Sequence, residues 1–356
     1  MQQFFSPCLI SVTFHGDGKT EPNADYQALA STISLLPTAC LEELTFKHLP
    51  SSTPIHLALS EIVQRLNARF KRLATGFSLS DAAWAHLISL PNLESFWVSG
   101  TPSAEIHKSK PRENGSPTLK SVLIEVDDAC QCWSPLFSLL GSGALQRVAI
   151  VTSRKIQDVD VPRQVTIAII EAKLQRNLNA LAFAGFNPTN SSFIPYLGSF
   201  NSLEVLWCNT WCRGSGQCIS QLTDSDVEQL ASGLPRLTSL WLGHGCKYNA
   251  HNTTIKSMIS LSTRCPSLES LGLPCNLTHI SKDVKTESGE PDPRLGVRSS
   301  SKLRYLAFQW IVLPSRDDVE GLKTVASCLS HLFPELRPGG QRTRREARID
   351  NQPSQI

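Results

Sequence analysis

The hydrophobic residues of this 356-residue chain return in a short cadence, Leu-x-x-Leu-x-Leu, along almost its whole length. Clear copies are Leu237-x-x-Leu240-x-Leu242 and Leu268-x-x-Leu271-x-Leu273. This cadence is the strand pattern of the leucine-rich repeat. The pattern therefore predicts an α/β fold, a leucine-rich-repeat solenoid that forms an open arc, with a parallel sheet on the concave face and helices on the convex face.

Successive copies can be aligned on their first apolar position. These positions are Leu9, Leu41, Leu93, Leu119, Leu145, Leu178, Leu203, Leu237, Leu268 and Leu303, with a weaker copy at Phe70 and a half-copy at Leu336. Consecutive starts lie between 23 residues (Phe70 to Leu93) and 35 residues (Leu268 to Leu303) apart. We therefore expect about 11–12 irregular repeats, most of them within or just above the usual length of a leucine-rich repeat.

Proline residues support this alignment. Five of them stand two residues before the first leucine of a copy: Pro91, Pro117, Pro235, Pro266 and Pro334. Proline cannot continue a helix and favours extended backbone in its predecessor, so each should end a helix and lead the chain into a strand.

Between the strands the apolar spacing changes from two toward 3.6, which predicts amphipathic helices over 24–36, 80–90, 223–234, 253–263 and 317–332. Thr223 with Asp226, and Ser80 followed by Asp81, are typical helix starts. Three connections, 100–117, 152–163 and 274–301, break the alternation. The solenoid should span 1–337, with a mobile polar insertion at 275–301 and a disordered basic tail at 338–356.

The composition is that of a soluble globular protein, with 41% hydrophobic and 18% charged residues. The net charge of +3 is too small for a nucleic-acid-binding surface. Neither a membrane span nor a secretory signal is expected, because no apolar run approaches about 18 residues and no basic residue precedes the first apolar stretch. We therefore expect a cytoplasmic or nuclear protein. The basic run 342–348 fits either a nuclear address or a solvated tail.

The 11 cysteines should be free thiols in a reducing compartment. A zinc site is the competing hypothesis, because stacked repeats would bring the loops after two neighbouring strands together. These loops carry Cys212, Cys218, His244 and Cys246. No CxxC pair supports the zinc site, so no resident metal or other cofactor is expected.

No Gly-rich phosphate loop, G-x-S-x-G elbow or H-E-x-x-H motif occurs, so the sequence offers no assembled catalytic group. A binding surface is better supported. The residues between the leucines should point into the concave face, and adjacent copies place Trp207 and Trp241 there. The predicted partner-binding residues are Trp207, Trp241, Glu204, Glu269, Arg304, Tyr305, Trp211 and Trp310. The alternative is that the tryptophans pack beneath a loop or terminal segment.

The stretch 222–243, together with 253–256 and 265–273, resembles the leucine-rich-repeat region of F-box proteins of mushroom-forming fungi. Residues 325–336 look like the end of the same arrays. In that family the repeats hold a substrate while an F-box docks on Skp1 within a cullin-based ubiquitin ligase. This chain enters its first repeat by Leu9 and has no recognisable F-box, so Skp1 and cullin are implied as partners only if an F-box exists outside it.

The resemblance favours a non-enzymatic protein-recognition module, the substrate-binding region of an F-box-type ubiquitin ligase adaptor, with a protein substrate on the concave face. A free-standing repeat scaffold without a ligase role is the first alternative. A small-GTPase-activating protein is the second, although relatives of that kind carry an acidic tail and this chain ends in basic sequence.

Overall fold

The computed structural model describes residues 6, 8–16, 26–49, 52–103, 106, 116–126, 133–141, 143–152, 160–186, 193–210, 222–244, 252–280, 302–307 and 311–336. Backbone contacts divide the chain into two compact units. The first contains Met1–Arg154 and Ala168–Asn177, and the second contains Lys155–Ile167 and Leu178–Ile356.

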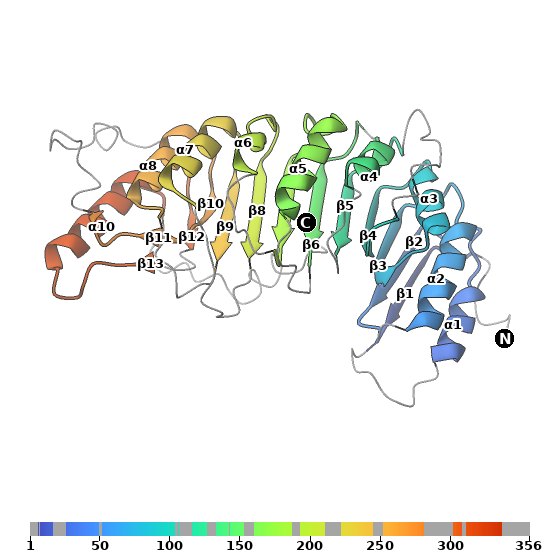
Figure 1. Ribbon diagram of the computed structural model, residues 1–356. Coiled ribbons are helices and arrows are strands. Elements are labelled where there is room, and N and C mark those ends of the chain that lie inside the picture. The colour runs from blue at the N-terminus through green and yellow to red at the C-terminus, as the bar shows by residue number, and fades with distance from the viewer. Residues whose placement is uncertain are drawn as a thin grey trace. The chain divides into compact units, whose positions relative to one another are not determined.

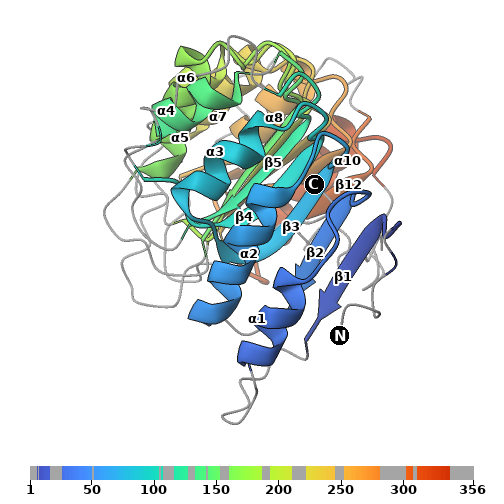
Figure 2. The ribbon, with the colours of Figure 1, turned by 90° about the vertical axis from the view of Figure 1, so that its right-hand side faces the viewer.

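The first unit is a parallel sheet with helices packed on one of its faces (Figures 1 and 2). Its strands, adjacent in chain order, are β1 (Ser11–His15), β2 (Glu43–Lys47), β3 (Arg72–Ser78), β4 (Ser95–Ser99), β5 (Ser121–Glu125) and β6 (Arg147–Val151). Its helices are α1 (Tyr26–Ser34), α2 (Thr53–Arg65), α3 (Asp81–Ser89) and α4 (Trp133–Leu140). Helix α5 (Val161–Glu171) is divided between the units: its residues up to Ile167 belong to the second unit, and its residues from Ala168 belong to the first.

The second unit repeats the same plan. Its sheet runs in the order β7 (Ala180–Ala184), β8 (Val205–Thr210), β9 (Ser239–His244), β10 (Ser270–Gly272) and β12 (Tyr305–Ala307). A separate short pair joins β11 (Cys275–Asn276) to β13 (Ile311–Val312). The helices are α6 (Ile194–Leu197), α7 (Asp224–Gly233), α8 (Ile255–Arg264) and α10 (Val319–Leu332).

The repeat leucines form continuous rows under the helices, as the cadence predicts. In the second unit Leu240 pairs in register with Leu206 on one side and Leu271 on the other, and all three are fully buried. Burying one such side chain stabilises the fold by about 1.5–3 kcal/mol, and in a stack each leucine is buried partly by the next repeat. The row therefore fixes which residues face the helices.

A forked backbone hydrogen bond at the start of each strand sets this register. The N–H groups of Thr238 and Ser239 both donate to the carbonyl of Glu204, at 2.8 and 3.0 Å. The carbonyl of Glu269 accepts in the same way from the next strand. Because the pattern recurs from repeat to repeat, equivalent positions lie side by side across each sheet.

The strands predicted from Leu9 to Leu303 are confirmed in position, and the five predicted helices occur as α1, α3, α7, α8 and α10. The half-copy at Leu336 runs into residues outside the described ranges. The capping predictions also hold. Thr223 and Asp226 form a reciprocal capping box at α7, and the Ser80 hydroxyl accepts from the N–H of Ala83 at α3.

The structure adds to two of the sequence predictions. Helix α5 begins at Val161, at the end of the 152–163 connection, and was not among the predicted helices. At the start of the predicted mobile insertion, Cys275, Leu277 and Ile280 are buried and β11 pairs with β13. The remainder of the insertion, 281–301, and the predicted tail, 338–356, lie outside the described residues.

Candidate functional site: an aromatic row on the sheet

The open face of the second unit's sheet, opposite the helices, carries the predicted aromatic residues. Leu240 and Leu242 point into the core, and side chains alternate along a strand, so Trp241 between them lies on the open face. Trp207 lies directly beside it in register on β8. Both tryptophans are half-buried.

Tyr305 joins the two tryptophans, although it lies two strands away from Trp241. The rings of Trp241 and Tyr305 lie with centroids 5.9 Å apart and planes inclined by 33°. The intervening strand carries Gly272 in register with Trp241. A Cβ atom on Gly272 would lie 2.9 Å from Cδ2 of Trp241 and closer still to Cε3, so the missing side chain is what lets the indole cover β10 and reach Tyr305. We call Trp207, Trp241 and Tyr305 the aromatic row.

Small residues also flank the other end of the aromatic row. Ala182 on β7 is in register with Trp207 and is only 3% exposed, although it lies on the open face. Neighbouring small side chains allow a large ring to lie over the adjacent strand instead of standing upright. The row therefore offers broad, half-exposed aromatic surface.

The charged residues predicted for the site lie at the beginning of the strands. Glu204 is half-buried, whereas Glu269 and Arg304 are exposed. The Arg304 Nε lies 3.7 Å from a carboxylate oxygen of Glu335. Among the described residues, neither Glu204 nor Glu269 forms an ion pair.

The first unit shows the opposite arrangement at the same repeat positions. Lys71 Nζ donates to Glu42 at 2.7 Å, and this contact raises the pKa of Lys71. Arg72 pairs with Glu43 and lies 3.8 Å from Glu94. These first-unit carboxylates therefore have cationic partners, whereas Glu204 and Glu269 form no ion pair among the described residues.

Several predicted site residues are outside the described part of the chain. Trp211 and Trp310 belong to this group, as do Cys212, Cys218 and Cys246 of the zinc hypothesis. His244 ends β9, but the position of its side chain is not described. Among the described residues no group of three or more metal-ligating side chains occurs, and Cys8, Cys40, Cys208, Cys265 and Cys328 are free thiols.

The structure adds two residues that the sequence predictions missed. Gly272 supports Trp241, and Trp97 occupies on β4 of the first unit the repeat position of Trp241. The signal was present in the sequence, since both residues stand between the second and third apolar positions of their copies. Trp97 is flanked in register by Ala74 and Leu123.

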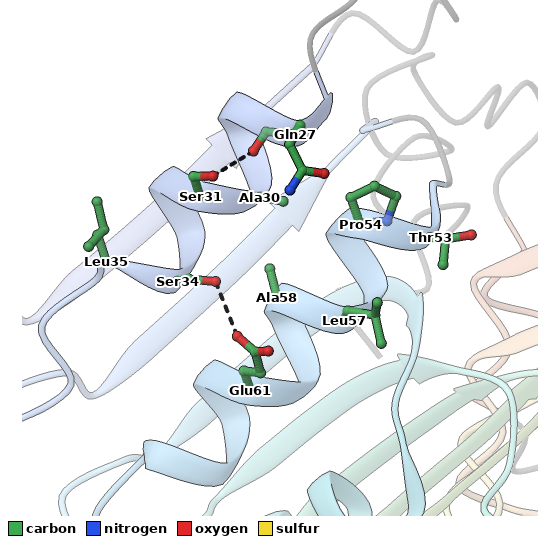
Figure 3. Close-up of a pocket in the computed structure, with 10 residues that line it drawn as sticks. All are labelled: Gln27, Ala30, Ser31, Ser34, Leu35, Thr53, Pro54, Leu57, Ala58 and Glu61. Atoms are coloured by element: carbon green, nitrogen blue, oxygen red, sulfur yellow. Dashed lines mark hydrogen bonds between the residues drawn. The ribbon is translucent and has the colours of Figure 1, made fainter.

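A hollow lies on the helical side of the first unit, between α1 and α2 (Figure 3). Its volume is about 590 Å³. Leu35 and Leu57 on its rim are 47% and 60% exposed, and Ala30 and Ala58 line it with small side chains. Glu61 is the only charged residue among the described residues of its lining and accepts from the Ser34 hydroxyl at 3.4 Å. The described lining of the groove is half polar and half apolar, and these residues form no cluster of reactive groups.

The repeated strand and helix, the buried leucine rows and the parallel register define a leucine-rich-repeat fold. A comparison with solved structures found the leucine-rich-repeat-containing protein LegL7 from Legionella pneumophila, at 13% identity and a TM-score of 0.41 over 90% of this chain and 97% of that chain. No family model and no curated protein matches the chain. No helix within the described ranges is long and apolar enough to cross a bilayer.

Proposed function

We propose that the chain is a non-enzymatic protein-recognition module that binds a protein partner on the open face of its second unit. The aromatic row carries this proposal, because Trp207, Trp241 and Tyr305 lie together and half-exposed on a face that no described helix covers. Tryptophan and tyrosine are enriched among the residues that dominate binding energy at protein interfaces. A stacked sheet holds such residues rigidly, which lowers the entropic cost of binding.

We further propose that the partner is a substrate and that the chain is the substrate-binding repeat region of an F-box-type ubiquitin ligase adaptor. The resemblance of 222–243 and 265–273 to fungal F-box repeat regions supports this assignment. In that role the repeats select the substrate, while Skp1 and the cullin are held through an F-box outside this chain.

Quantitative affinity capture tests both proposals, partner recognition by the aromatic row and the ligase-adaptor role. The tagged wild-type chain and a Trp207→Ala/Trp241→Ala variant would be expressed in a mushroom-forming fungus, cross-linked and analysed by mass spectrometry. Recognition by the aromatic row predicts at least a roughly tenfold loss of a defined partner from the variant, since truncating a dominant interface aromatic costs about 2 kcal/mol or more. Val319→Ala, which trims an exposed apolar residue on α10, is the matched control and should retain the partner.

The ligase role has its own readout in the same experiment. Skp1 and a cullin should be recovered with the full gene product in both the wild type and the aromatic variant. Recovery of the partner without Skp1 or cullin would reject the adaptor role and favour a free-standing scaffold. Equal partner recovery by the wild type and the aromatic variant would reject the recognition site itself.

A further inference from the structure

The aromatic row and its neighbouring carboxylates form a surface suited to arginine side chains. A guanidinium group stacks favourably on the faces of tryptophan and tyrosine. The chain already contains one such contact, with Arg163 lying 5.9 Å from the ring centre of Tyr196. Glu204 and Glu269, which have no ion pair among the described residues, supply negative charge at the start of the same strands.

One segment of this chain has the complementary chemistry. Residues 337–348 contain five arginines and a single acidic residue, Glu346, so their net charge is +4. The whole chain carries only +3. The segment therefore accounts for more than the entire excess of positive charge.

The described part of the chain ends at Leu336, directly before this segment and close to the aromatic row. Glu335, two residues before Arg337, lies 3.7 Å from Arg304, which immediately precedes Tyr305. The row extends from β12 to β8, which is three strand spacings or about 14 Å. An extended chain advances about 3.3 Å per residue, so the arginines between 342 and 348 are within reach of every ring in the row.

We propose that the arginine-rich segment 337–348 occupies the aromatic row in the free protein and competes there with the protein partner. This inference rests on the proposed function, because it assigns the same face to both ligands. Tethering gives the segment an effective concentration in the millimolar range, so a weak contact is enough to keep the row occupied. A partner then binds well only if it displaces the segment, and arginine in that partner is the natural competitor.

A labelled synthetic peptide of residues 337–348 tests the proposal by fluorescence anisotropy. It would be titrated with the full wild-type chain and with a full chain in which Arg337, Arg342, Arg344, Arg345 and Arg348 are all replaced by Gln. We expect the peptide to bind the neutralised chain at least about tenfold more tightly, because the competing segment has been disabled. Equal affinities would overturn the proposal and leave the row open to arginine from other chains only.

Two further variants of the neutralised chain locate the binding. Trp241→Ala and Glu204→Gln/Glu269→Gln should each weaken peptide binding at least about tenfold, and the second keeps the shape of the site intact should the first disturb folding. Trp97→Ala, at the equivalent repeat position of the first unit, is the matched control and should bind as the neutralised chain does. Loss of binding in the control, or retention in both test variants, would place the peptide elsewhere and reject the proposal.

The chemistry of recognition has a separate test. A peptide in which every arginine is replaced by lysine keeps the charge but loses the planar guanidinium, and it should bind the neutralised chain several-fold more weakly. Equal affinities of the arginine and lysine peptides would mean that charge alone holds the segment. That result would reject stacking of guanidinium groups on the aromatic row. Partner capture by the aromatic row is measured independently, so the proposed function can stand even where the segment fails to bind.

Discussion

Gly272 is the residue that gives the aromatic row its geometry. Trp241 covers it, and the Cδ2 and Cζ3 atoms of the indole would each lie 2.9 Å from an added Cβ. Any side chain at this position has to push the indole away from β10 and from Tyr305. A residue that makes no hydrogen bond through its side chain thus controls the site.

Gly272→Ala should destabilise the protein by roughly 1–2 kcal/mol, because the displaced indole loses its packing on Tyr305 and the overpacking cost exceeds the entropic gain from replacing glycine. Chemical denaturation followed by tryptophan fluorescence measures this change. Gly76→Ala is the control, since a Cβ at Gly76 meets nothing within 4 Å. Equal effects of the two substitutions would show that Trp241 does not rest on Gly272.

The buried thiols of Cys208 and Cys265 should not react with alkylating reagents in the folded protein. Burial raises the pKa of Cys208 and of Cys265 to about 12, so only about one thiol in ten thousand is ionised at pH 8. Iodoacetamide at pH 8 should label the exposed Cys8 and leave Cys208 and Cys265 unmodified, as peptide mass spectrometry would show. All three should react after denaturation, and rapid labelling of Cys208 without denaturant would contradict its burial.

At the scale of elements, α7 and α8 are joined by a polar contact between repeats. The Asp224 carboxylate accepts from the N–H and hydroxyl of Thr254 at 2.7 and 2.8 Å, and from the N–H and hydroxyl of Ser257 at 3.1 and 2.5 Å. The negative charge therefore lies at the N-terminus of α8, where it also interacts favourably with the helix dipole. One residue at the start of α7 fixes the position of the next helix.

Asp224→Ala should lower the free energy of unfolding by about 2 kcal/mol, because it removes the acceptor of the Thr254 N–H at the N-cap of α8 and of the Thr254 and Ser257 hydroxyls. Equilibrium urea denaturation measures the loss. Glu228→Ala is a matched control, since Glu228 also links α7 to α8, through Arg264 at 2.7 Å, but both side chains are about half exposed. Such a surface pair contributes at most about 1 kcal/mol, so a larger effect at Glu228 than at Asp224 would contradict this account.

The elements also show why sequence patterns predicted the strands better than the helices. The strand pattern requires an apolar side chain at fixed spacing, so it was recognisable in the copies from Leu9 to Leu303, although more weakly at Phe70. Helix α5 was missed because Val165, Thr166, Ile167, Ile169 and Ile170 are β-branched and locally favour a strand. Burial of Val165 and Ile169 overrides that local preference.

At the scale of the whole molecule, a destabilising substitution in one repeat should affect mainly that repeat and the repeats next to it. Each leucine row is completed by its immediate neighbours, as Leu240 is by Leu206 and Leu271. The energetics of such an array are a sum of the stability of each repeat and its contacts with the next. Local unfolding caused by a substitution in one repeat should accordingly stay within the unit that contains it.

Leu240→Ala should cost about 2–5 kcal/mol and increase amide hydrogen exchange in β8, β10, α7 and α8, while β2 and β3 of the first unit keep their protection. Hydrogen exchange with mass spectrometry resolves these segments. Leu44→Ala in β2, equally buried, should give the opposite distribution. Uniform loss of protection over both units from either substitution would show that the chain unfolds as a single cooperative block.

The period-two alternation within each strand was enough to assign Leu240 and Leu242 to the core and Trp207 and Trp241 to the open face, because neighbouring side chains on a strand point in opposite directions. Register, strand order and the pairing of the two tryptophans followed from aligning the copies. Only the tertiary structure decided that Trp241 contacts Tyr305 across Gly272. It also decided that Glu204 and Glu269 form no ion pair among the described residues. Both features depend on the direction in which side chains from repeats far apart in the sequence point. A local pattern of apolar residues carries no information about that direction.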